Sequence, residues 1–297
     1  FQGHTDRKRR FRGEAHDHIP LAHSLSRTET TAITNMHPNK PPFQPPISII
    51  TVVYNNAAGI EKTILSVLSQ TYPSIEFIII DGGSTDGTLN TIQKYENRIA
   101  YWRSEPDKGI YDAMNKGIKQ ATSRYVMFLN SGDDFFENNS LEKIVKSNDK
   151  DYDIVYNNIN FIPNGEEPYS SHYPTILSFD HFIYDTIPHP AALIKKELFA
   201  TIGLYDDTFK IVSDWKWFLI AIVRFKATYK YSDVVAANFY MDGISSIKEN
   251  EDLVFRERSE VLVTEFGFHL PSPHKKRKKH FSLKKILKIF NTKFKEE

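Results

Sequence analysis

The stretch Tyr125-Val-Met-Phe-Leu-Asn-Ser-Gly-Asp-Asp134 joins a short apolar run directly to a turn of polar and acidic residues. An earlier stretch, Ser104-Glu-Pro-Asp-Lys-Gly-Ile-Tyr-Asp-Ala-Met-Asn-Lys-Gly117, also sets acidic residues beside glycine. In an α/β sheet, ligands bind at polar groups that follow the carboxyl ends of the strands. Carboxylates among small residues at that place favour a hard divalent cation that also contacts phosphate oxygens. The alternative is a polar turn in which glycine and aspartate serve only the backbone geometry.

Two further strand ends show the same organisation. Ile47-Ser-Ile-Ile-Thr-Val-Val-Tyr-Asn-Asn56 is a β-branched run without proline, which predicts a central strand buried on both faces. Ile75-Glu-Phe-Ile-Ile-Ile-Asp-Gly-Gly-Ser-Thr-Asp-Gly-Thr88 runs into a glycine-rich turn, where Ser84, Thr85 or Asp86 can cap the helix that follows.

Strands and helices alternate along the first half of the chain. We expect strands at 47–54, 75–80, 100–102 and 124–129, and helices at 58–70, 87–96 and 109–122. Such alternation predicts right-handed βαβ units, and therefore a Rossmann-type α/β fold whose mainly parallel sheet is flanked by helices. The second half is less regular, with expected strands at 153–161 and 234–240 and expected helices at 198–202 and 214–224.

The composition excludes several kinds of site. The 297 residues contain no cysteine, so a disulfide framework, a thiolate nucleophile and a zinc–thiolate site are impossible. Hydrophobic residues make up 40% of the chain, which is enough for a substantial core. No run of 18 apolar residues is present, and no apolar stretch follows Arg7-Lys-Arg-Arg10. We therefore expect neither a transmembrane helix nor a signal peptide, and a cytoplasmic protein.

The last residues differ in charge from the rest of the chain. Residues 275–297 hold ten Lys and Arg but two Glu, whereas 47–274 carry a net negative charge. If 281–294 is helical, its apolar residues share one stripe, which predicts a basic amphipathic helix on an anionic membrane surface. Nucleic-acid binding is the rival for such a run, but no nucleic-acid-reading module accompanies it. A solvated tail is the remaining alternative.

A fourth piece lies far downstream, where Pro188-His-Pro-Ala-Ala-Leu-Ile194 precedes Gly203-Leu-Tyr-Asp-Asp-Thr-Phe-Lys-Ile-Val-Ser-Asp-Trp-Lys-Trp-Phe-Leu219. With the four pieces in this order, residues 47–268 resemble the family 2 glycosyltransferases of the GT-A fold. The likeness is greatest to bacterial members that build capsule, O-antigen or exopolysaccharide. The resemblance implies a metal-dependent, inverting enzyme that moves a hexosyl or N-acetylhexosaminyl group from a nucleotide sugar. UDP is the expected nucleotide, and the expected acceptor is a hydroxyl of a saccharide or lipid-linked saccharide.

The resemblance also divides the chain into parts. Residues 1–46 are interpreted as a tag remnant and a proline-rich lead-in, with Met36 as the expected native start. Residues 47–134 form the nucleotide-sugar half of one domain, and 135–268 form its acceptor half. Residues 269–297 are the basic tail, which implies an enzyme held peripherally at the inner face of the plasma membrane.

The donor site implied by the resemblance lies at the strand ends. Tyr54 and Asn55 match the pocket for the nucleotide base, where the Tyr54 ring can stack. Asp81 matches an acid that bonds base or ribose, and Gly82 stands where many relatives carry a second acid. The other positions implied at the donor are Val52, Val53, Ser84, Asp107, Lys108, Gly109, Asp112, Asn115, Asn130, Ser131 and Gly132.

Some of these residues leave an alternative open. Pro106-Asp-Lys-Gly109 is also a good turn sequence, in which Asp107 would serve the backbone alone. Asp112, Asn115 and Lys119 are spaced to share one face of a helix, which could simply be solvated.

The metal site implied by the resemblance departs from the family pattern. An Asp-x-Asp motif holds the ion in this family, and Asn130-Ser-Gly-Asp133 occupies its place. Asp133 matches the usual metal ligand, whereas Asn130 and Gly132 replace earlier carboxylates. One carboxylate with phosphate oxygens and waters suffices for Mn²⁺ or Mg²⁺, so the departure weakens the expected site without removing it. Asp134 is expected to cap a helix or face solvent.

Asp214 is the residue that the resemblance makes the general base. It matches the acid ahead of a helix in the family, where it would take the proton of the acceptor hydroxyl. The alternative is that Asp214 only caps that helix, which Ser213 could do equally well. His189 and Trp215 are implied on the acceptor side, although a lone histidine is often structural.

A function of another class remains as the rival. A non-catalytic nucleotide-sugar-binding or scaffold protein would explain a metal motif that has lost two carboxylates. The presence of both Asp133 and Asp214 argues against it. A sugar nucleotidyltransferase would share the architecture, but Tyr54-Asn-Asn-Ala-Ala-Gly59 lacks a basic, glycine-rich triphosphate loop.

Overall fold

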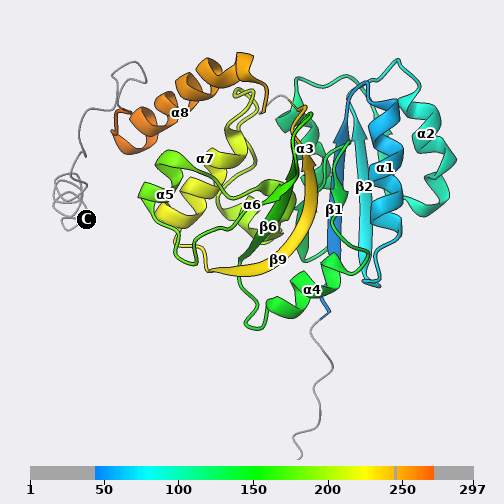
Figure 1. Cartoon of the computed structure of the whole chain (residues 1–297), viewed down its shortest axis with the longest axis horizontal. Coiled ribbons are helices and arrows are strands. Elements are labelled where there is room, and N and C mark those ends of the chain that lie inside the picture. Colours follow the sequence, from blue (N-terminus) through cyan, green and yellow to red (C-terminus); the bar gives the residue numbers. More distant parts are fainter. Residues whose placement is uncertain (1–43, 244–245, 271–297) are drawn as a thin grey trace, which may run out of the picture. The chain divides into compact units, whose positions relative to one another are not determined.

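The computed structural model describes residues 44–243 and 246–270, all of which belong to one compact unit (Figure 1). Its strands are β1 Ile47–Val53, β2 Ile75–Asp81, β3 Tyr101–Ser104, β4 Tyr125–Phe128, β5 Asp134–Phe135, β6 Ile154–Ile162, β7 Tyr169–Ser170, β8 Ala192–Lys195 and β9 Tyr229–Tyr240. Its α-helices are α1 Ala57–Leu68, α2 Thr88–Lys94, α3 Ile110–Gln120, α4 Ser140–Ser147, α5 Phe179–Tyr184, α6 Glu197–Thr201, α7 Ser213–Leu219 and α8 Glu251–Phe266. Shorter helical turns are η1 Glu96–Arg98, η2 His189–Ala191, the π-helical η3 Ile220–Arg224, and η4 Lys248–Asn250.

The strands form one sheet in the order β3-β2-β1-β4-β8-β6-β9-β5, with β7 paired to β6. The first four strands of this order are all parallel. The register pairs Val53 with Asp81 and Asp81 with Ser104, so β1, β2 and β3 end side by side. Beyond β4 the sheet is mixed, because β8 runs antiparallel to both of its neighbours. The predicted α/β sheet flanked by helices is confirmed.

The central strand explains how the core divides into two layers. All seven residues of β1 are buried, as its uninterrupted β-branched run predicts. Side chains alternate between the faces of a strand. Ile47 and Ile49 therefore pack with α1 and α2 on one face, and Ile50 and Val52 pack with α3 on the other. Figure 1 shows α1 and α2 beside β1 and β2, with α5 to α8 grouped at the far end of the sheet.

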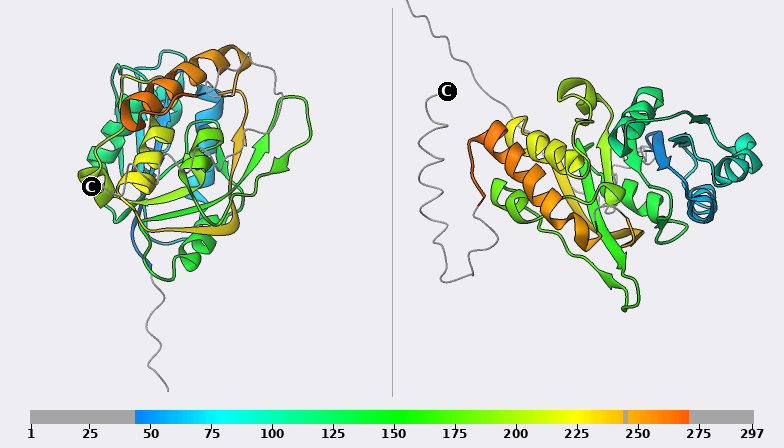
Figure 2. Two further views of the ribbon diagram at one scale, coloured as in Figure 1. Left: turned by 90° about the vertical axis from the view of Figure 1, so that its left-hand side faces the viewer. Right: turned by 90° about the horizontal axis from the view of Figure 1, so that it is seen from above.

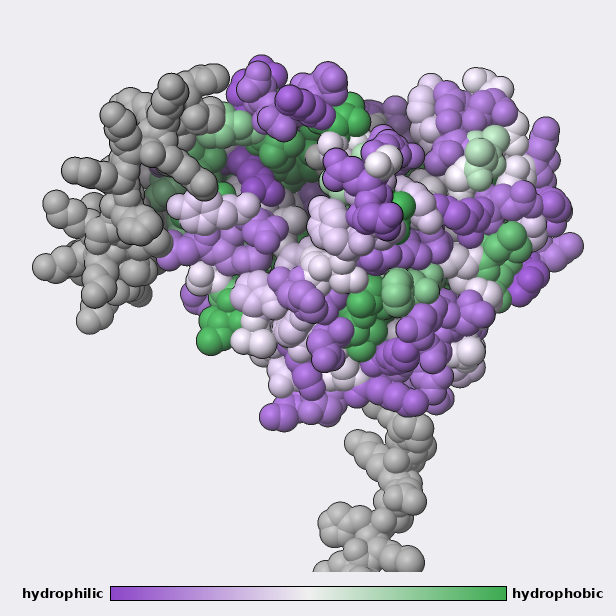
Figure 3. All heavy atoms as spheres, in the orientation of Figure 1, coloured by the Kyte–Doolittle hydropathy of each residue, from purple (hydrophilic) through white to green (hydrophobic). Residues whose placement is uncertain are grey.

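The helix α8 lies next to α7 in Figure 2. Ion pairs join α8 to α7 and to η3, since Glu265 lies 3.7 Å from Lys216 of α7 and 2.9 Å from Arg224 of η3. The face seen in Figure 3 is mainly hydrophilic, with hydrophobic residues in a hollow next to α8. Within the described residues, no helix has both the length and the apolar character to cross a membrane.

Most expected elements are present with ends shifted by a few residues. Exceptions lie in the second half, where β9 begins at Tyr229 rather than at 234 and the helix expected at 214–224 changes to a π-helical turn at Ile220. The elements that the sequence did not predict are α4, α5, α8, β5, β7 and β8. Most of the lead-in predicted at 1–46 and the basic residues at 275–297 lie outside the described residues, and the domain boundaries stay predictions.

Candidate functional site

A cavity of about 1000 Å³ opens where the parallel strands end. Of the residues that the sequence analysis assigned to the site, those in its wall are Val52, Val53, Tyr54, Asp107, Gly109, Asn130, Ser131, Gly132, Asp133, His189, Asp214 and Trp215. Those outside the wall are Asn55, Asp81, Gly82, Ser84, Lys108, Asp112 and Asn115. The fold therefore gathers residues from five separate stretches of sequence into one cavity. Their roles in binding and catalysis stay predictions.

Asp81 holds together the loop that follows β2, beneath the pocket predicted for the nucleotide base. Its carboxylate is fully buried and accepts hydrogen bonds from the Gly83 and Ser84 amides, at 3.0 and 2.9 Å, and from the Ser84 and Ser104 hydroxyls. The Ser84 hydroxyl in turn accepts from the Asn55 amide at 2.7 Å. Asp81 thus supports the end of β1, where the Tyr54 ring stands 65% exposed beside the cavity.

Asp107 occupies the space beside Gly82. A Cβ built on Gly82 would lie 2.5 Å from Oδ2 of Asp107 and 3.3 Å from the Tyr54 ring. Because Gly82 has no side chain, the Asp107 carboxylate occupies the space that a second acid after β2 would take. Burial raises the pKa of Asp107, although a hydrogen bond from the Gly109 amide works in the opposite direction.

Asp112 and Asn115, expected together on one face of α3, do not line the cavity. Asn115 is buried and exchanges two hydrogen bonds with the backbone of Tyr205, at 2.8 and 3.0 Å. Asp112 accepts from the Lys108 amide at 3.2 Å and pairs with Lys116 at 3.2 Å. These contacts fix α3 and the turn before it.

The loop from Asn130 to Asp133 is held tightly over the end of β1. Thr63 Oγ1 donates to the Asp133 carbonyl at 2.7 Å and accepts from the Gly132 amide at 3.0 Å. Gly132 adopts a φ of 106°, which a side chain would strain, so the backbone itself disfavours a carboxylate there. Asp134 begins β5 and accepts from Asn238 at 3.0 Å, so the expectation that it caps a helix or faces solvent is wrong.

Asp133 is a buried acid with one backbone partner. Its side chain accepts from the Tyr240 amide at 3.1 Å. Burial raises the pKa of Asp133 to about 7, while the Tyr240 amide and the charge of Lys62 act in the opposite direction. A cation beside the carboxylate would favour the ionised form.

The loop fits a hard cation, with few ligands from the protein itself. Oδ1 of Asn130 and Oγ of Ser131 are buried oxygens without hydrogen-bond partners, next to Asp133 in the chain. Oxygen ligands are what Mg²⁺ and Mn²⁺ prefer. Within the part of the chain that the structure describes, no three His, Cys, Asp or Glu side chains cluster as a metal site. An ion held here would therefore depend on ligand oxygens and waters in addition to Asp133.

Asp214 lies at the centre of a hydrogen-bonded chain. Oδ1 accepts from Oη of Tyr111 at 2.8 Å, and Oδ2 lies 2.9 Å from Nδ1 of His189. Nε2 of His189 lies 3.1 Å from Nδ2 of Asn130. Since that amide nitrogen can only donate, Nε2 accepts and Nδ1 carries the proton that bonds Asp214. His189 is thus paired, and it links the loop from Asn130 to Asp133 with Asp214.

These contacts set the charge state of Asp214. Burial on its own raises the pKa of Asp214, but the hydrogen bonds from His189 and Tyr111 outweigh it, so the pKa lies below its ordinary value. The carboxylate is therefore ionised at neutral pH. Asp214 lies within the first turn of α7, and no side chain caps that helix, so the capping alternative is not observed.

Glu257 is a residue that the sequence analysis missed. From α8 its buried carboxylate accepts the amides of Lys210, Ile211 and Val212, at 2.8, 3.0 and 3.2 Å. These are the residues that lead into α7, so Glu257 fixes the backbone ahead of Asp214. No local pattern marks Glu257, because its partners are more than forty residues away in the sequence.

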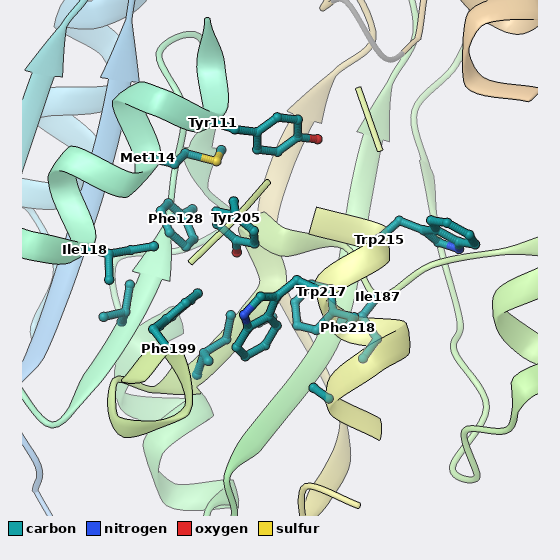
Figure 4. Packing of buried hydrophobic residues seen from close by; sticks show 14 of the residues in the cluster. Tyr111, Met114, Ile118, Phe128, Ile187, Phe199, Tyr205, Trp215, Trp217 and Phe218 are labelled. Carbon is teal, nitrogen blue, oxygen red and sulfur yellow. The ribbon is translucent and has the colours of Figure 1, made fainter. Parts of the chain in front are cut away.

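The packing beneath the cavity orients Tyr111 and Trp215. Figure 4 shows Tyr111 projecting from α3 over Tyr205, and the ring centroids of this pair are 5.7 Å apart. On α7, Trp217 points toward Phe199, whereas Trp215 points to the opposite side. Trp215 is 2% exposed, and its indole nitrogen donates to the Phe182 carbonyl at 2.8 Å.

Solved structures with a similar fold include complexes with a nucleotide and with a nucleotide sugar. Staphylococcus aureus TarS matches with a TM-score of 0.59 and 19% identity, over 77% of this chain and 41% of TarS. A TarS fragment in complex with UDP matches with a TM-score of 0.57 and 20% identity, over 73% of this chain and 65% of the fragment. The mannosyltransferase PcManGT of Pyrobaculum calidifontis, in complex with GDP-Man and Mn²⁺, matches with a TM-score of 0.55 and 16% identity, over 78% of this chain and 67% of PcManGT. At these identities the likeness confirms the GT-A fold and nothing finer.

Sequence relatives agree with the fold. An uncharacterized glycosyltransferase of Mycobacterium tuberculosis is 33% identical over 195 residues, which are 60% of this chain and 69% of the relative. A PGL/p-HBAD biosynthesis glycosyltransferase of Mycobacterium bovis is 28% identical over 207 residues, 66% of this chain and 77% of the relative. The family model "Glycosyl transferase family 2" matches residues 48–210, more than half of the chain. The chain therefore belongs to glycosyl transferase family 2.

Proposed function

We propose that the protein transfers a sugar from a nucleoside-diphosphate sugar to a hydroxyl group of a saccharide acceptor, with inversion at the anomeric carbon. The observation that carries the proposal is the Asp214 carboxylate in the wall of the cavity at the strand ends, where Tyr111 and His189 hold its two oxygens. Family 2 membership supports the transfer itself. A carboxylate that is both desolvated and fixed by two hydrogen bonds suits a general base, because geometry and protonation state are set before the acceptor binds.

In the proposed reaction Asp214 takes the proton of the acceptor hydroxyl. The hydroxyl oxygen forms a bond to the anomeric carbon as the bond from that carbon to the diphosphate oxygen breaks. The diphosphate leaves with the electron pair of the broken bond. Tyr111 and His189 keep Asp214 oriented, since each holds one of its oxygens.

On the donor side, the Tyr54 ring is the proposed surface for the nucleotide base, at the end of β1. Asp133 would hold Mn²⁺ or Mg²⁺ together with diphosphate oxygens. A bound ion would act as a Lewis acid that stabilises the leaving diphosphate. The buried, partnerless oxygens of Asn130 and Ser131 support an oxygen-rich site at this loop.

We further propose a UDP-sugar as donor and a surface saccharide, free or lipid-linked, as acceptor. UDP is bound to the TarS fragment of similar fold, and a GDP-sugar with Mn²⁺ is bound to PcManGT. A cytoplasmic enzyme at the inner face of the plasma membrane is proposed from the basic residues of 275–297.

The experiment is a screen of UDP- and GDP-sugars for nucleotide release with Mn²⁺, alone and with saccharide acceptors. We expect one donor to be consumed faster than the rest, and NMR of the product to show an inverted anomeric configuration. A retained configuration would contradict the single displacement. Nucleotide binding without turnover of any donor would favour the non-catalytic alternative.

A further inference from the structure

Arg258 of α8 lines the same cavity, beside Trp215. Its guanidinium carbon lies 4.9 Å from the centroid of the indole ring. Nε is buried and has no hydrogen-bond partner. Among the described residues, no carboxylate oxygen lies within 4.0 Å of the guanidinium, since none of their ion pairs includes Arg258. A positive charge therefore stands in the cavity wall with no ionic partner in the part of the chain that the structure describes.

Its surroundings do not compensate this charge. Burial lowers the pKa of Arg258, and the more distant charges of Asp214 and Asp185 only partly oppose the effect. An indole face attracts a cation, but it offers no acceptor for the N–H groups. A buried donor without an acceptor calls for an explanation, and an anionic ligand is one that also satisfies the charge.

The position of Arg258 favours the acceptor over the donor diphosphate. Its guanidinium packs on Trp215, the residue next to Asp214 in α7. The loop from Asn130 to Asp133 is instead held by Thr63 of α1. Arg258 therefore belongs to the part of the cavity wall that carries the proposed base. A molecule whose hydroxyl meets Asp214 would therefore bring its neighbouring groups to Arg258.

The backbone around Arg258 is fixed independently of any ligand. Its neighbour Glu257 binds the three amides that lead into α7, the helix that carries Asp214. The same turn of α8 therefore fixes the backbone ahead of Asp214 and the position from which the Arg258 guanidinium extends. Such support is what a specificity-determining side chain needs, since it holds the geometry before binding.

We propose that Arg258 is an anion subsite for the acceptor, so that the preferred acceptor carries a carboxylate or phosphate close to the hydroxyl that is glycosylated. A uronic acid and a sugar phosphate, including one linked to a lipid, would both present this chemistry. The inference rests on the proposed function, because it takes Asp214 to mark the acceptor side.

The test compares binding of matched neutral and charged sugars to the full chain saturated with UDP and Mn²⁺. The probes are glucose, glucuronate and glucose 1-phosphate, and binding is followed by calorimetry or ligand-observed NMR. We expect at least one charged probe to bind about tenfold or more tightly than glucose, the scale of one charge-assisted hydrogen bond. Preference for glucuronate alone would indicate a uronic acid, and preference for glucose 1-phosphate alone would indicate a phosphate.

Variants assign the preference to the residue. Arg258→Gln should bind all three probes with similar affinity and should keep the wild-type affinity for UDP. Arg258→Lys keeps the charge without the planar fork and should retain part of the preference, so it also serves if Arg258→Gln does not fold. Arg256→Gln is the matched control, because Arg256 is exposed on the same helix; it should behave as wild type.

Three results would overturn the proposal. They are a wild type that does not prefer either charged probe, an Arg258→Gln variant that keeps the preference, and an Arg258→Gln variant that loses UDP affinity to the same extent. The last would assign Arg258 to the donor. Charged-probe binding that depends on Arg258 in a protein without transferase activity would support the subsite while refuting the proposed function. Transfer to neutral acceptors that Arg258→Gln leaves unchanged would support the proposed function while refuting the anion subsite.

Discussion

Replacing Asp214 by asparagine removes the proposed proton acceptor while keeping the shape of the cavity wall. The amide oxygen can still accept from Tyr111, whose oxygen lies 2.8 Å from Oδ1 of Asp214. The amide NH₂ then faces His189, which can change tautomer so that Nδ1 accepts. Nε2 would then donate to Asn130, whose Oδ1 is buried without a partner and can turn toward it. The hydrogen-bonded chain can thus reverse without losing a bond, so the variant should fold.

The chemical step has no such substitute. An amide cannot take the hydroxyl proton, and loss of a general base costs about 10²-fold to 10⁴-fold in rate. The lower end corresponds to about 2.7 kcal/mol of activation free energy. We expect Asp214→Asn to lower kcat by about 10²-fold or more, with the Kd for UDP unchanged within experimental error.

The assay is nucleotide release in the presence of acceptor, with calorimetry for UDP binding and thermal unfolding as a check on folding. Asp206→Asn is the matched control, because Asp206 precedes the same helix and pairs with Lys216 at 2.8 Å outside the hydrogen-bonded chain of Asp214. Near wild-type turnover in Asp214→Asn would refute the role as base. Equal losses in both variants would mean that the loop ahead of α7 was disturbed.

Asp133→Ala should abolish the gain in UDP affinity that Mn²⁺ gives the wild type, as measured by calorimetry with metal and with chelator; equal affinities in all four conditions would argue against the metal site. Without metal, burial raises the pKa of Asp133 to about 7, so the ionised carboxylate costs folding free energy progressively as the pH rises from about 4 to about 7. Asp133→Asn should therefore unfold at a higher temperature than wild type at pH 8 in chelator, with the advantage shrinking toward pH 4. Glu257→Gln should lower the free energy of unfolding by about 1.5–3 kcal/mol, because a buried charged acceptor of three amides is replaced by a neutral one; Glu260→Gln, exposed on the same helix, should not. Removing 275–297 should abolish binding to vesicles of anionic lipid, which in the full chain should weaken with added salt; unchanged binding would remove the membrane proposal.

The parts of the fold that sequence patterns predicted are those decided by neighbouring residues. β1 is buried along its whole length, as its run of β-branched residues predicts. The glycines and aspartates after β1, β2 and β4 mark where each strand stops, and parallel pairing then brings the ends together. This is why most of the residues expected at the donor are in or directly beneath one cavity wall.

The parts that were missed depend on distant partners. β5 has two residues and exists because it pairs with β9, a hundred residues later. The apolar residues of α8 do not form one stripe, so periodicity gives no sign of the helix. His189 and Asp214 were each expected at the site, but their contact, and the contact of Tyr111 with Asp214 across 103 residues, requires the folded chain.

The residues proposed to bind the leaving nucleotide lie within the part of the chain that the family model matches. The family model ends at residue 210, and the residues it spans include the strand ends and the loop of Asp133. Asp214, Glu257 and Arg258 all lie beyond that limit. A transferase must bind and stabilise the leaving nucleotide in much the same way whatever sugar it carries. Acceptors differ in shape and charge, so each requires different side chains in the cavity wall. In α8, Glu257 supports the backbone ahead of the proposed base, and the next residue, Arg258, lies in the cavity wall. Substitutions in such a helix can alter the preference for the acceptor without altering the donor half.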